Sequence, residues 1–410
     1  MGVGLWLNHQ AIDKVLFRAF TRSRVRHMFG LSSDESIAGA TNSRARHLCC
    51  APTGCISTPC CRDTDAANSL DGCGVTDAGR TFWCVHDGGC GNRRQAMAVA
   101  EGLAIRSDAE VREVVVSVQR PWRWLAPHWL PRSPAAFGEA FADVCADGAG
   151  RLVVGCGRQA ALATRWLRAK RGFKALQILD PRIDTDFYDL VIAPEHDGLV
   201  GDNVVSTLGS LHSINAGWLA QARIASSQLG LVPAPRTLLL LGGPTRHHAM
   251  DQAYWTGLRE RVESWLESEG GSLWVSSSRR TPKWLRKAAR DELPGRQWHG
   301  SQDGDNPYSG MIAWADRIIV TADSANLVSE ACATSVPVYC HAPEVQQGKI
   351  GHLFTRLQDR GRLRVLRPHS EDARFGVIEP LRSLDATIDE VQKRLGLPTA
   401  EPLRRQPRLA

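Results

Sequence analysis

Lysine is scarce in this 410-residue chain, which has 7 lysines against 43 arginines and 43 acidic residues. The formal net charge is +7, but the basic residues are scattered among the acids. A nucleic-acid-binding surface usually gathers lysine and arginine in one patch, so we expect no nucleic-acid partner. Long apolar runs are also missing. None approaches the ~18 residues that cross a bilayer, so the sequence predicts no transmembrane helix.

Paired cysteine motifs of the metal-binding kind are absent as well. Eight of the 12 cysteines fall between Cys49 and Cys90, yet the run from Cys49 to Cys61 contains no C-x-x-C pair and no zinc-finger histidine spacing. Residues 1–30 lack the clean basic start and apolar stretch of a secretory signal. We therefore expect free thiols, no metal site and a cytoplasmic location.

Residues 1–79 differ in composition from the remainder of the chain. One amphipathic helix is predicted over residues 12–20, and Gly, Ser, Thr, Asn, Asp and Cys dominate the rest without a lasting period. Such a stretch buries too little apolar area to offset its ordering entropy. We expect a disordered, Cys-rich extension outside the folded protein. The alternatives are a Cys-rich metal tag and a targeting leader, although acidic residues argue against a transit peptide.

From Thr81 onward, short apolar strands alternate with helices, and glycines stand at the junctions. This alternation predicts parallel, doubly wound α/β sheets. A second series opens at the apolar strand 236–241, after a segment that contains two prolines. The length also fits two hydrophobic cores. The sequence thus predicts two Rossmann-like domains, residues 80–230 and 231–366, followed by a C-terminal helix and loose tail over 367–410.

Two strand ends in the second domain have the chemistry of a phosphate site. Gly242, Gly243 and Thr245 follow the first strand, where glycine amides can approach a phosphate and Thr245 adds a hydroxyl. Asp323 and Ser324 follow a later strand, and either can cap the next helix, whose N-terminus attracts anions. The plain alternatives are an ordinary turn and an ordinary capped helix.

Two further residues of the second domain extend this prediction. Arg279 follows a third strand, and strand ends of one parallel sheet meet at one edge, so we expect a shared crevice there. Glu330 lies about two turns into the helix after Ser324, and its carboxylate can accept hydrogen bonds from sugar hydroxyls. We expect it on an accessible helix surface; the alternative is a merely solvated glutamate.

The first domain offers candidates for a general base. Asp87 begins a glycine-rich turn, and His196 stands between two acids after a strand. A separate turn, Gly155-Cys156-Gly157, opens a helix about twenty residues before Asp180. That spacing matches a dinucleotide fingerprint and leaves an NAD-dependent enzyme as an alternative.

A tryptophan-rich segment stands apart from these motifs. Trp122, Trp124 and Trp129 lie within residues 121–131, with arginines around them. Tryptophan beside arginine is typical of a membrane interface or a partner groove. The alternative is a proline-bent loop whose rings cap the core.

Several short blocks, read together, resemble the mitochondrial fission family of plants and many bacteria. They recur in order over roughly residues 81–366, at residues 87–95, 177–182, 194–197, 201–209, 242–244, 278–282, 306–308 and 321–324. Where family members usually carry Thr-Asp-Gly-Arg-Ala-Gly-Asn, this chain has His-Asp-Gly-Gly-Cys-Gly-Asn at 86–92. The resemblance implies a two-domain, glycosyltransferase-B-like fold with a cleft between the domains. Plant members of the family act as adaptors that recruit fission machinery.

Residues 327–337 also look like the donor-binding segment of the peptidoglycan N-acetylglucosaminyltransferase. There a glutamate holds the donor ribose, and the matching residue is Glu330. Ser335 departs from the usual glycine.

These resemblances imply sugar transfer from a nucleotide-sugar donor, without metal or other cofactor. Arg279 would offset leaving-group charge, and the acceptor would be lipid-linked or part of the envelope, at the inner membrane surface. The alternatives are a non-catalytic adaptor and an NAD-dependent nucleotide-sugar oxidoreductase or epimerase.

Overall fold

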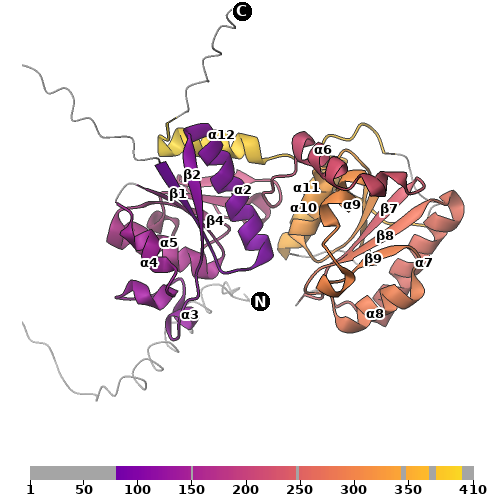
Figure 1. Cartoon of the computed structure of the whole chain (residues 1–410), viewed down its shortest axis with the longest axis horizontal. Helices are drawn as coiled ribbons and strands as arrows, with labels where there is room; N and C mark the ends of the chain where they lie inside the picture. The colour runs from indigo at the N-terminus through magenta and orange to yellow at the C-terminus, as the bar shows by residue number, and fades with distance from the viewer. Residues whose placement is uncertain (1–79, 149–150, 246–248, 343–347, 369–374, 399–410) are drawn as a thin grey trace, which may run out of the picture. The chain divides into compact units, whose positions relative to one another are not determined.

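The computed structural model describes residues 80–148, 151–245, 249–342, 348–368 and 375–398 (Figure 1). The predicted extension over residues 1–79, including its helix at 12–20 and its cysteine run, lies outside these ranges. In the described parts of the chain, no helix combines the length and apolar content needed to cross a membrane.

The first sheet has six parallel strands in the order β2-β1-β3-β4-β5-β6. Residues alternate between its two faces, as the pleat of a strand requires. In β1, Phe82 and Cys84 join the apolar layer under α2, whereas Trp83 and Val85 join the layer under α5. The bounds are β1 Arg80–His86, α2 Cys90–Ser107, β2 Ala109–Val115, α3 Trp122–Leu125, α4 Phe141–Ala146, β3 Leu152–Cys156, α5 Arg158–Arg171, β4 Lys174–Ile178, β5 Leu190–Pro194 and β6 Val204–Thr207.

The second sheet also has six parallel strands, in the order β12-β11-β10-β7-β8-β9. Leu238 and Leu240 of β7 face one apolar layer, and Leu239 and Leu241 face the other. The bounds are α6 Ala216–Ala225, β7 Arg236–Leu241, α7 Gln252–Glu269, β8 Ser272–Ser277, α8 Lys283–Glu292, β9 Arg296–Trp298, α9 Tyr308–Trp314, β10 Arg317–Thr321, α10 Ala325–Cys332, β11 Val338–His341, α11 Gly348–Asp359, β12 Arg364–Val365 and α12 Leu384–Leu395. Short 3₁₀ turns occur at Pro134–Phe137, Thr185–Phe187, Glu195–Asp197, Ser227–Leu231 and Ser301–Asp303.

Apolar layers therefore cover both faces of each sheet, as doubly wound parallel sheets require. This confirms the predicted α/β fold class with two Rossmann-like, doubly wound domains.

Two segments connect the sheets. Residues 208–229 contribute Leu208, Leu219 and Leu229 to the core of the second sheet, and α6 packs on α9, ahead of the boundary that the sequence predicts at residue 231. The chain then returns at its end, where α12 packs on α2, β5 and β6 of the first sheet (Figure 1). The C-terminal helix is thus a structural part of the first domain.

Candidate functional site

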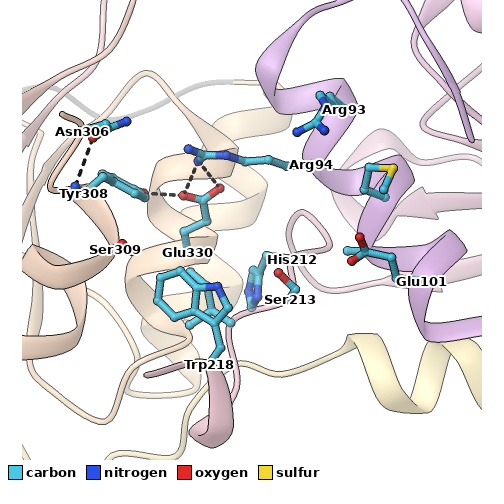
Figure 2. A pocket seen from close by; sticks show the side chains of 13 residues that line it. Arg93, Arg94, Glu101, His212, Ser213, Trp218, Asn306, Tyr308, Ser309 and Glu330 are labelled. Carbon is cyan, nitrogen blue, oxygen red and sulfur yellow. Dashed lines mark hydrogen bonds and ion pairs between the residues drawn. The ribbon is translucent and has the colours of Figure 1, made fainter. Parts of the chain in front are cut away.

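A cavity of about 340 Å³ is lined by residues from helices that pack on the two sheets and from the segment between the sheets (Figure 2). One wall comes from α2, and another comes from the start of α9 and from Glu330 in the second half of α10. The lining residues are Arg93, Arg94, Met97, Ala98, Glu101, His212, Ser213, Ile214, Trp218, Asn306, Tyr308, Ser309 and Glu330. Charged, aromatic and imidazole side chains thus meet in one pocket.

Glu330 lies at the centre of this pocket and is only 5% exposed. Arg94 donates to both of its carboxylate oxygens at 3.1 Å, and the Tyr308 hydroxyl donates a further hydrogen bond (Figure 2). Burial and the Glu330 carboxylate raise the pKa of Tyr308 well above its usual value, so the hydroxyl keeps its proton and donates. The expectation of an accessible Glu330 is wrong, and so is the alternative of a solvated glutamate, because Arg94 and Tyr308 donate to a buried carboxylate.

His212 approaches the same pocket from the connecting segment. The backbone N–H of Ser210 donates to Ser329 Oγ at 2.9 Å, which ties this segment to α10. The His212 ring is 7% exposed, and its Nδ1 has no hydrogen-bond partner among the described residues. Burial lowers the pKa of His212 and outweighs the nearby Glu330 carboxylate, which raises it. The ring is therefore neutral at pH 7 and is able to accept a proton.

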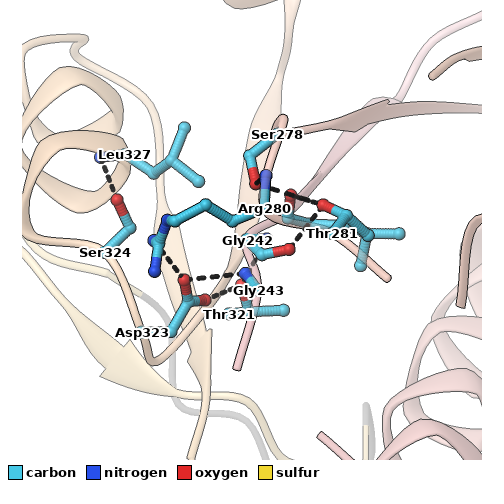
Figure 3. A network of polar contacts seen from close by, with 10 residues as sticks. Gly242, Gly243, Ser278, Arg280, Thr281, Thr321, Asp323, Ser324 and Leu327 are labelled. Atoms are coloured by element: carbon cyan, nitrogen blue, oxygen red, sulfur yellow. Dashed lines mark hydrogen bonds and ion pairs between the residues drawn. The ribbon is translucent and has the colours of Figure 1, made fainter. Parts of the chain in front are cut away.

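The predicted phosphate turn forms a tight polar network at the edge of the second sheet (Figure 3). Gly242 N–H donates to Thr321 Oγ1 at 2.8 Å, and Gly243 N–H donates to Asp323 Oδ2 at 2.9 Å. A Cβ on Gly242 would lie 2.0 Å from the Asp323 carboxylate. Glycine is needed there for close packing, and both amides already have partners inside the chain.

The cation in this network is Arg280 rather than Arg279. Arg280 donates to Asp323 Oδ2 at 2.7 Å, whereas Arg279 is exposed and its carbonyl accepts from Arg286. Thr245 is exposed just beyond the glycine turn. Ser324 caps α10 by accepting a hydrogen bond from the N–H of Leu327. The sequence thus placed the strand ends correctly on one sheet edge, and the structure adds Arg280 to them.

The Asp87 turn lies against the start of α10. Asp87 Oδ1 accepts from Gly89 N–H and from Asn92 Nδ2, both at 3.1 Å, and no side chain caps α2. A Cβ on Gly91 would lie 2.4 Å from the side-chain nitrogen of Asn326. The N-terminal ends of α2 and α10 therefore approach each other, and each carries a partial positive charge.

His196 occupies a different place. Its neighbours Asp197 and Glu195 pair with Lys349 and Arg356 of α11, at 2.8 and 3.3 Å. Burial lowers the pKa of His196, and its ring lines a separate cavity of about 360 Å³. Neither His196 nor Asp87 lines the pocket that holds Glu330.

Comparison with known proteins assigns the chain to a protein family. A family model described as "Mitochondrial fission ELM1" matches residues 90–395. The chain belongs to this family.

Two curated relatives illustrate the range of the ELM1 family. The mitochondrial fission protein ELM1 of Arabidopsis thaliana is 29% identical over 248 residues, which are 52% of this chain and 56% of the relative. The chain thus spans about half the length of this plant relative. The uncharacterized protein RP120 of Rickettsia prowazekii (strain Madrid E) is 22% identical over 301 residues, 64% of this chain and 83% of the relative.

Solved structures similar to the chain include MurG, a UDP-GlcNAc 2-epimerase and a forosaminyltransferase. MurG of Acinetobacter baumannii aligns with a TM-score of 0.39 and 14% identity, covering 77% of this chain and 92% of MurG. The UDP-GlcNAc 2-epimerase of Methanocaldococcus jannaschii aligns with a TM-score of 0.49 and 11% identity, covering 77% and 99%. The spinosyn forosaminyltransferase SpnP aligns with a TM-score of 0.40 and 13% identity, covering 78% and 96%.

The dinucleotide-type turn is filled by the chain itself. A Cβ on Gly157 would lie 2.4 Å from the side-chain nitrogen of Asn92. Asp180 Oδ1 accepts from the N–H of Arg182 at 2.7 Å. In the described ranges, no group of three His, Cys, Asp or Glu side chains is arranged to hold a metal ion.

Sequence reasoning missed Arg94, Tyr308, His212 and Trp218. Arg94 lies on α2, Tyr308 begins α9, and His212 and Trp218 lie on the segment between the sheets, so no local pattern joins all four. Tyr308 stands inside a block that the family resemblance had singled out, and this is the one signal that could have pointed to it. Arg94 stands in another such block, but its pairing with Glu330 appears only in three dimensions.

Proposed function

We propose that this chain binds a nucleotide sugar in the pocket around Glu330 and transfers its sugar to an acceptor without a metal. The observation that carries the proposal is the arrangement of Glu330 with Arg94, Tyr308 and His212 in one cavity. Such a set combines hydroxyl recognition, positive charge and a neutral base. A nucleoside diphosphate sugar needs hydroxyl recognition for its sugars and positive charge for its phosphates, and sugar transfer needs a base.

The diphosphate would lie beside the facing starts of α2 and α10. Two helix N-termini attract an anion, and the Ser324 side chain caps α10 at the N–H of its third residue, Leu327. Arg93 and Arg94 line the pocket, and Arg280 is half-exposed at the neighbouring strand end. Thr245 and Arg279 stay proposed phosphate-side groups, since both are exposed.

The ribose would bind Glu330. The carboxylate already accepts from Arg94 and Tyr308, so a ribose diol must take over part of this bonding. Gly242, Gly243 and Asp323 would act by shaping the strand edge rather than by touching the ligand. The Gly242 N–H donates to Thr321, the Gly243 N–H donates to Asp323, and Asp323 also accepts from Arg280.

Sugar transfer also needs a base for the acceptor hydroxyl. Asp87 and His196 stay proposed for this role, and His212 joins them because it lines the same pocket as Glu330. The acceptor oxygen would bond to the anomeric carbon as its proton passes to the base. The bond from that carbon to the diphosphate would break, and the nucleoside diphosphate would leave with the electron pair. We propose a lipid-linked or envelope acceptor.

A non-catalytic adaptor is the second candidate function. The plant relative is named a mitochondrial fission protein, and the Gly242 and Gly243 amides are engaged within the chain. An adaptor would keep this network as part of its fold. An NAD-dependent reaction is less well supported, because Asn92 fills the space at the Gly157 turn.

The test is calorimetric titration of the wild type, Glu330→Gln and Glu390→Gln with UDP and GDP. Glutamine keeps the size of the buried side chain. Charge-assisted hydrogen bonds contribute about 1.5–3 kcal/mol, so Glu330→Gln should weaken binding roughly ten- to a hundred-fold. Glu390 pairs with Arg394 on α12, away from the pocket lining, and is the matched control.

Three outcomes distinguish nucleotide binding at Glu330 from nucleotide binding elsewhere and from the adaptor function. Loss of binding in Glu330→Gln alone supports the ribose assignment. Equal binding by the wild type and Glu330→Gln would show that the ribose lies elsewhere. If the wild type binds neither nucleotide at millimolar concentration, the adaptor function becomes the better one.

A further inference from the structure

The tryptophan-rich segment divides into a buried part and an exposed part. Trp122 packs against the apolar core of the first sheet. Trp124 and Trp129, in contrast, are 58% and 49% exposed. The predicted core-capping role therefore fits Trp122, while the other two rings face solvent. Large exposed aromatic side chains on an ordered segment indicate a contact surface.

Exposed arginines lie on this segment and at the start of α5, where Arg158 donates to the Arg123 carbonyl at 3.2 Å. Arg120 stacks over the Trp124 ring, with its guanidinium carbon 5.0 Å from the ring centroid. The exposed arginines are Arg120, Arg123, Arg132 and Arg158. Within the described ranges, none of these four forms an ion pair with a carboxylate. Their charge is available to an anionic partner.

A fifth arginine holds the segment in place. Arg165 donates to the carbonyls of Pro127 and His128 at 2.9 and 3.1 Å. Its guanidinium carbon lies 3.8 Å from the ring centroid of Phe187, which is itself 41% exposed. Burial, Arg165 and Arg158 lower the pKa of His128, which agrees with a positively charged neighbourhood.

These exposed aromatic rings, together with the exposed arginines that form no ion pair with a carboxylate of the described residues, make up what we call the aromatic–arginine surface: Arg120, Arg123, Trp124, Trp129, Arg132, Arg158 and Phe187. Tryptophan rings favour the headgroup level of a bilayer, where their apolar body and polar N–H are both satisfied. Arginines are attracted to the negative surface of anionic lipids. A soluble acidic protein would match the charge, but it would not by itself explain three exposed rings.

We propose that the aromatic–arginine surface docks the first domain on an anionic phospholipid bilayer. The inference is independent of nucleotide binding, because none of its residues lines the pocket around Glu330. If the proposed function also holds, docking would bring the protein to a membrane that carries lipid-linked acceptors.

The experiment is co-sedimentation of the full chain with phosphatidylcholine vesicles that either contain or lack phosphatidylglycerol. We expect wild-type protein to sediment with the anionic vesicles, and added salt to weaken this binding because it screens surface charge. Phosphatidylcholine alone should bind less protein.

Three variants dissect the surface. Trp124→Ser with Trp129→Ser should lose most vesicle binding while its melting temperature stays near that of the wild type, since both rings are exposed. Arg123→Gln with Arg132→Gln should lose about fivefold per arginine on anionic vesicles and little on neutral ones. Trp284→Ser, on α8 of the second sheet and 39% exposed, is the matched control and should bind like the wild type.

The proposal is overturned if wild-type protein does not sediment with anionic vesicles, or if the Trp124/Trp129 variant binds them as well as the wild type does. Sedimentation velocity tests whether a second copy of the chain, instead of a membrane, covers the aromatic–arginine surface. A wild-type dimer that becomes a monomer in the same variant, without vesicle binding, would assign this surface to a second copy of the chain. If the tryptophan variant fails to fold, the arginine variant still decides the question.

Discussion

Arg94 and Glu330 are 236 positions apart in the sequence, yet the guanidinium of Arg94 donates to both carboxylate oxygens of Glu330 at 3.1 Å (Figure 2). The two side chains come from helices that pack on different sheets. The Glu330 side chain is 7% exposed and that of Arg94 is 48% exposed. A buried carboxylate in one domain is therefore neutralised by a partly solvated cation of the other.

The first prediction concerns this pair. Arg94→Gln should lower the free energy of unfolding by about 1–2 kcal/mol, because it leaves Glu330 buried with Tyr308 as its remaining donor. The figure is below the 3–5 kcal/mol of a fully buried broken pair, since Arg94 is half-exposed and solvent screens it. Urea unfolding of the wild type, Arg94→Gln, Glu330→Gln and the double variant gives the coupling energy. Additive effects in this cycle would show that the ion pair contributes nothing.

The second prediction concerns the glycine turn. Gly242→Ala should destabilise the protein by about 1–3 kcal/mol, because the new methyl group would meet the Asp323 carboxylate at 2.0 Å. Gly376→Ala is the control, since nothing lies within 4 Å of its added Cβ. Thermal unfolding of both variants measures the difference. If Gly242→Ala is as stable as Gly376→Ala, close packing is not the reason for this glycine.

The third prediction concerns acid stability near the Asp87 turn. Hydrogen bonds from Arg93 and then His86 outweigh burial and lower the pKa of Glu113 to about 2 from 4.5. A lowered carboxyl pKa stabilises the fold above the unfolded value, and this contribution is lost as the pH falls from about 4.5 to about 2. Glu113→Gln should therefore be less stable than the wild type at pH 7 and lose less stability over that acid range.

Glu110→Gln is the matched control for this prediction. Glu110 lies on the same strand, but it is 62% exposed, and among the described residues it pairs with Arg112 alone. Chemical unfolding at several pH values compares the two variants. Identical acid profiles for Glu113→Gln and the wild type would count against a stabilising role of Glu113.

The sequence predicted the sheet architecture because its signals are local. Strand periodicity, glycines at strand ends and the Ser324 cap each lie within a few residues of one another. The same locality explains where prediction failed. The sequence predicts an accessible position for Glu330 because no neighbouring residue indicates that Arg94 or the Tyr308 hydroxyl will contact it. The contact between Arg94 and Glu330 depends on how the two domains pack, and the periodicity of apolar residues in the sequence does not indicate that packing.

The bases illustrate the same limit. The flanking acids of His196 suggest a base in the sequence, but in the structure those acids pair with Lys349 and Arg356. His212 has apolar and hydroxyl neighbours in the sequence and carried no signal. It becomes notable through burial, its unpartnered Nδ1 and its place in the pocket.

The last prediction tests how His212 communicates with Glu330. Burial lowers the pKa of His212 below 6.5, and the Glu330 carboxylate acts in the opposite direction. Removing that negative charge should lower the pKa further. In Glu330→Gln, His212 should thus titrate at a lower pH than in the wild type, and in Glu390→Gln it should not move.

Proton NMR of the histidine rings measures this directly. The chain has 13 histidines, so the His212 signal is identified as the one that is missing in His212→Gln. The effect on stability has a definite sign. As the pH falls through about 6.5 the unfolded chain binds a proton before folded His212 does, so the wild type loses stability that His212→Gln retains. A His212 signal that titrates at the same pH in the wild type and in Glu330→Gln would show that the two groups do not share a pocket in solution, and Asp87 or His196 would then be the better base.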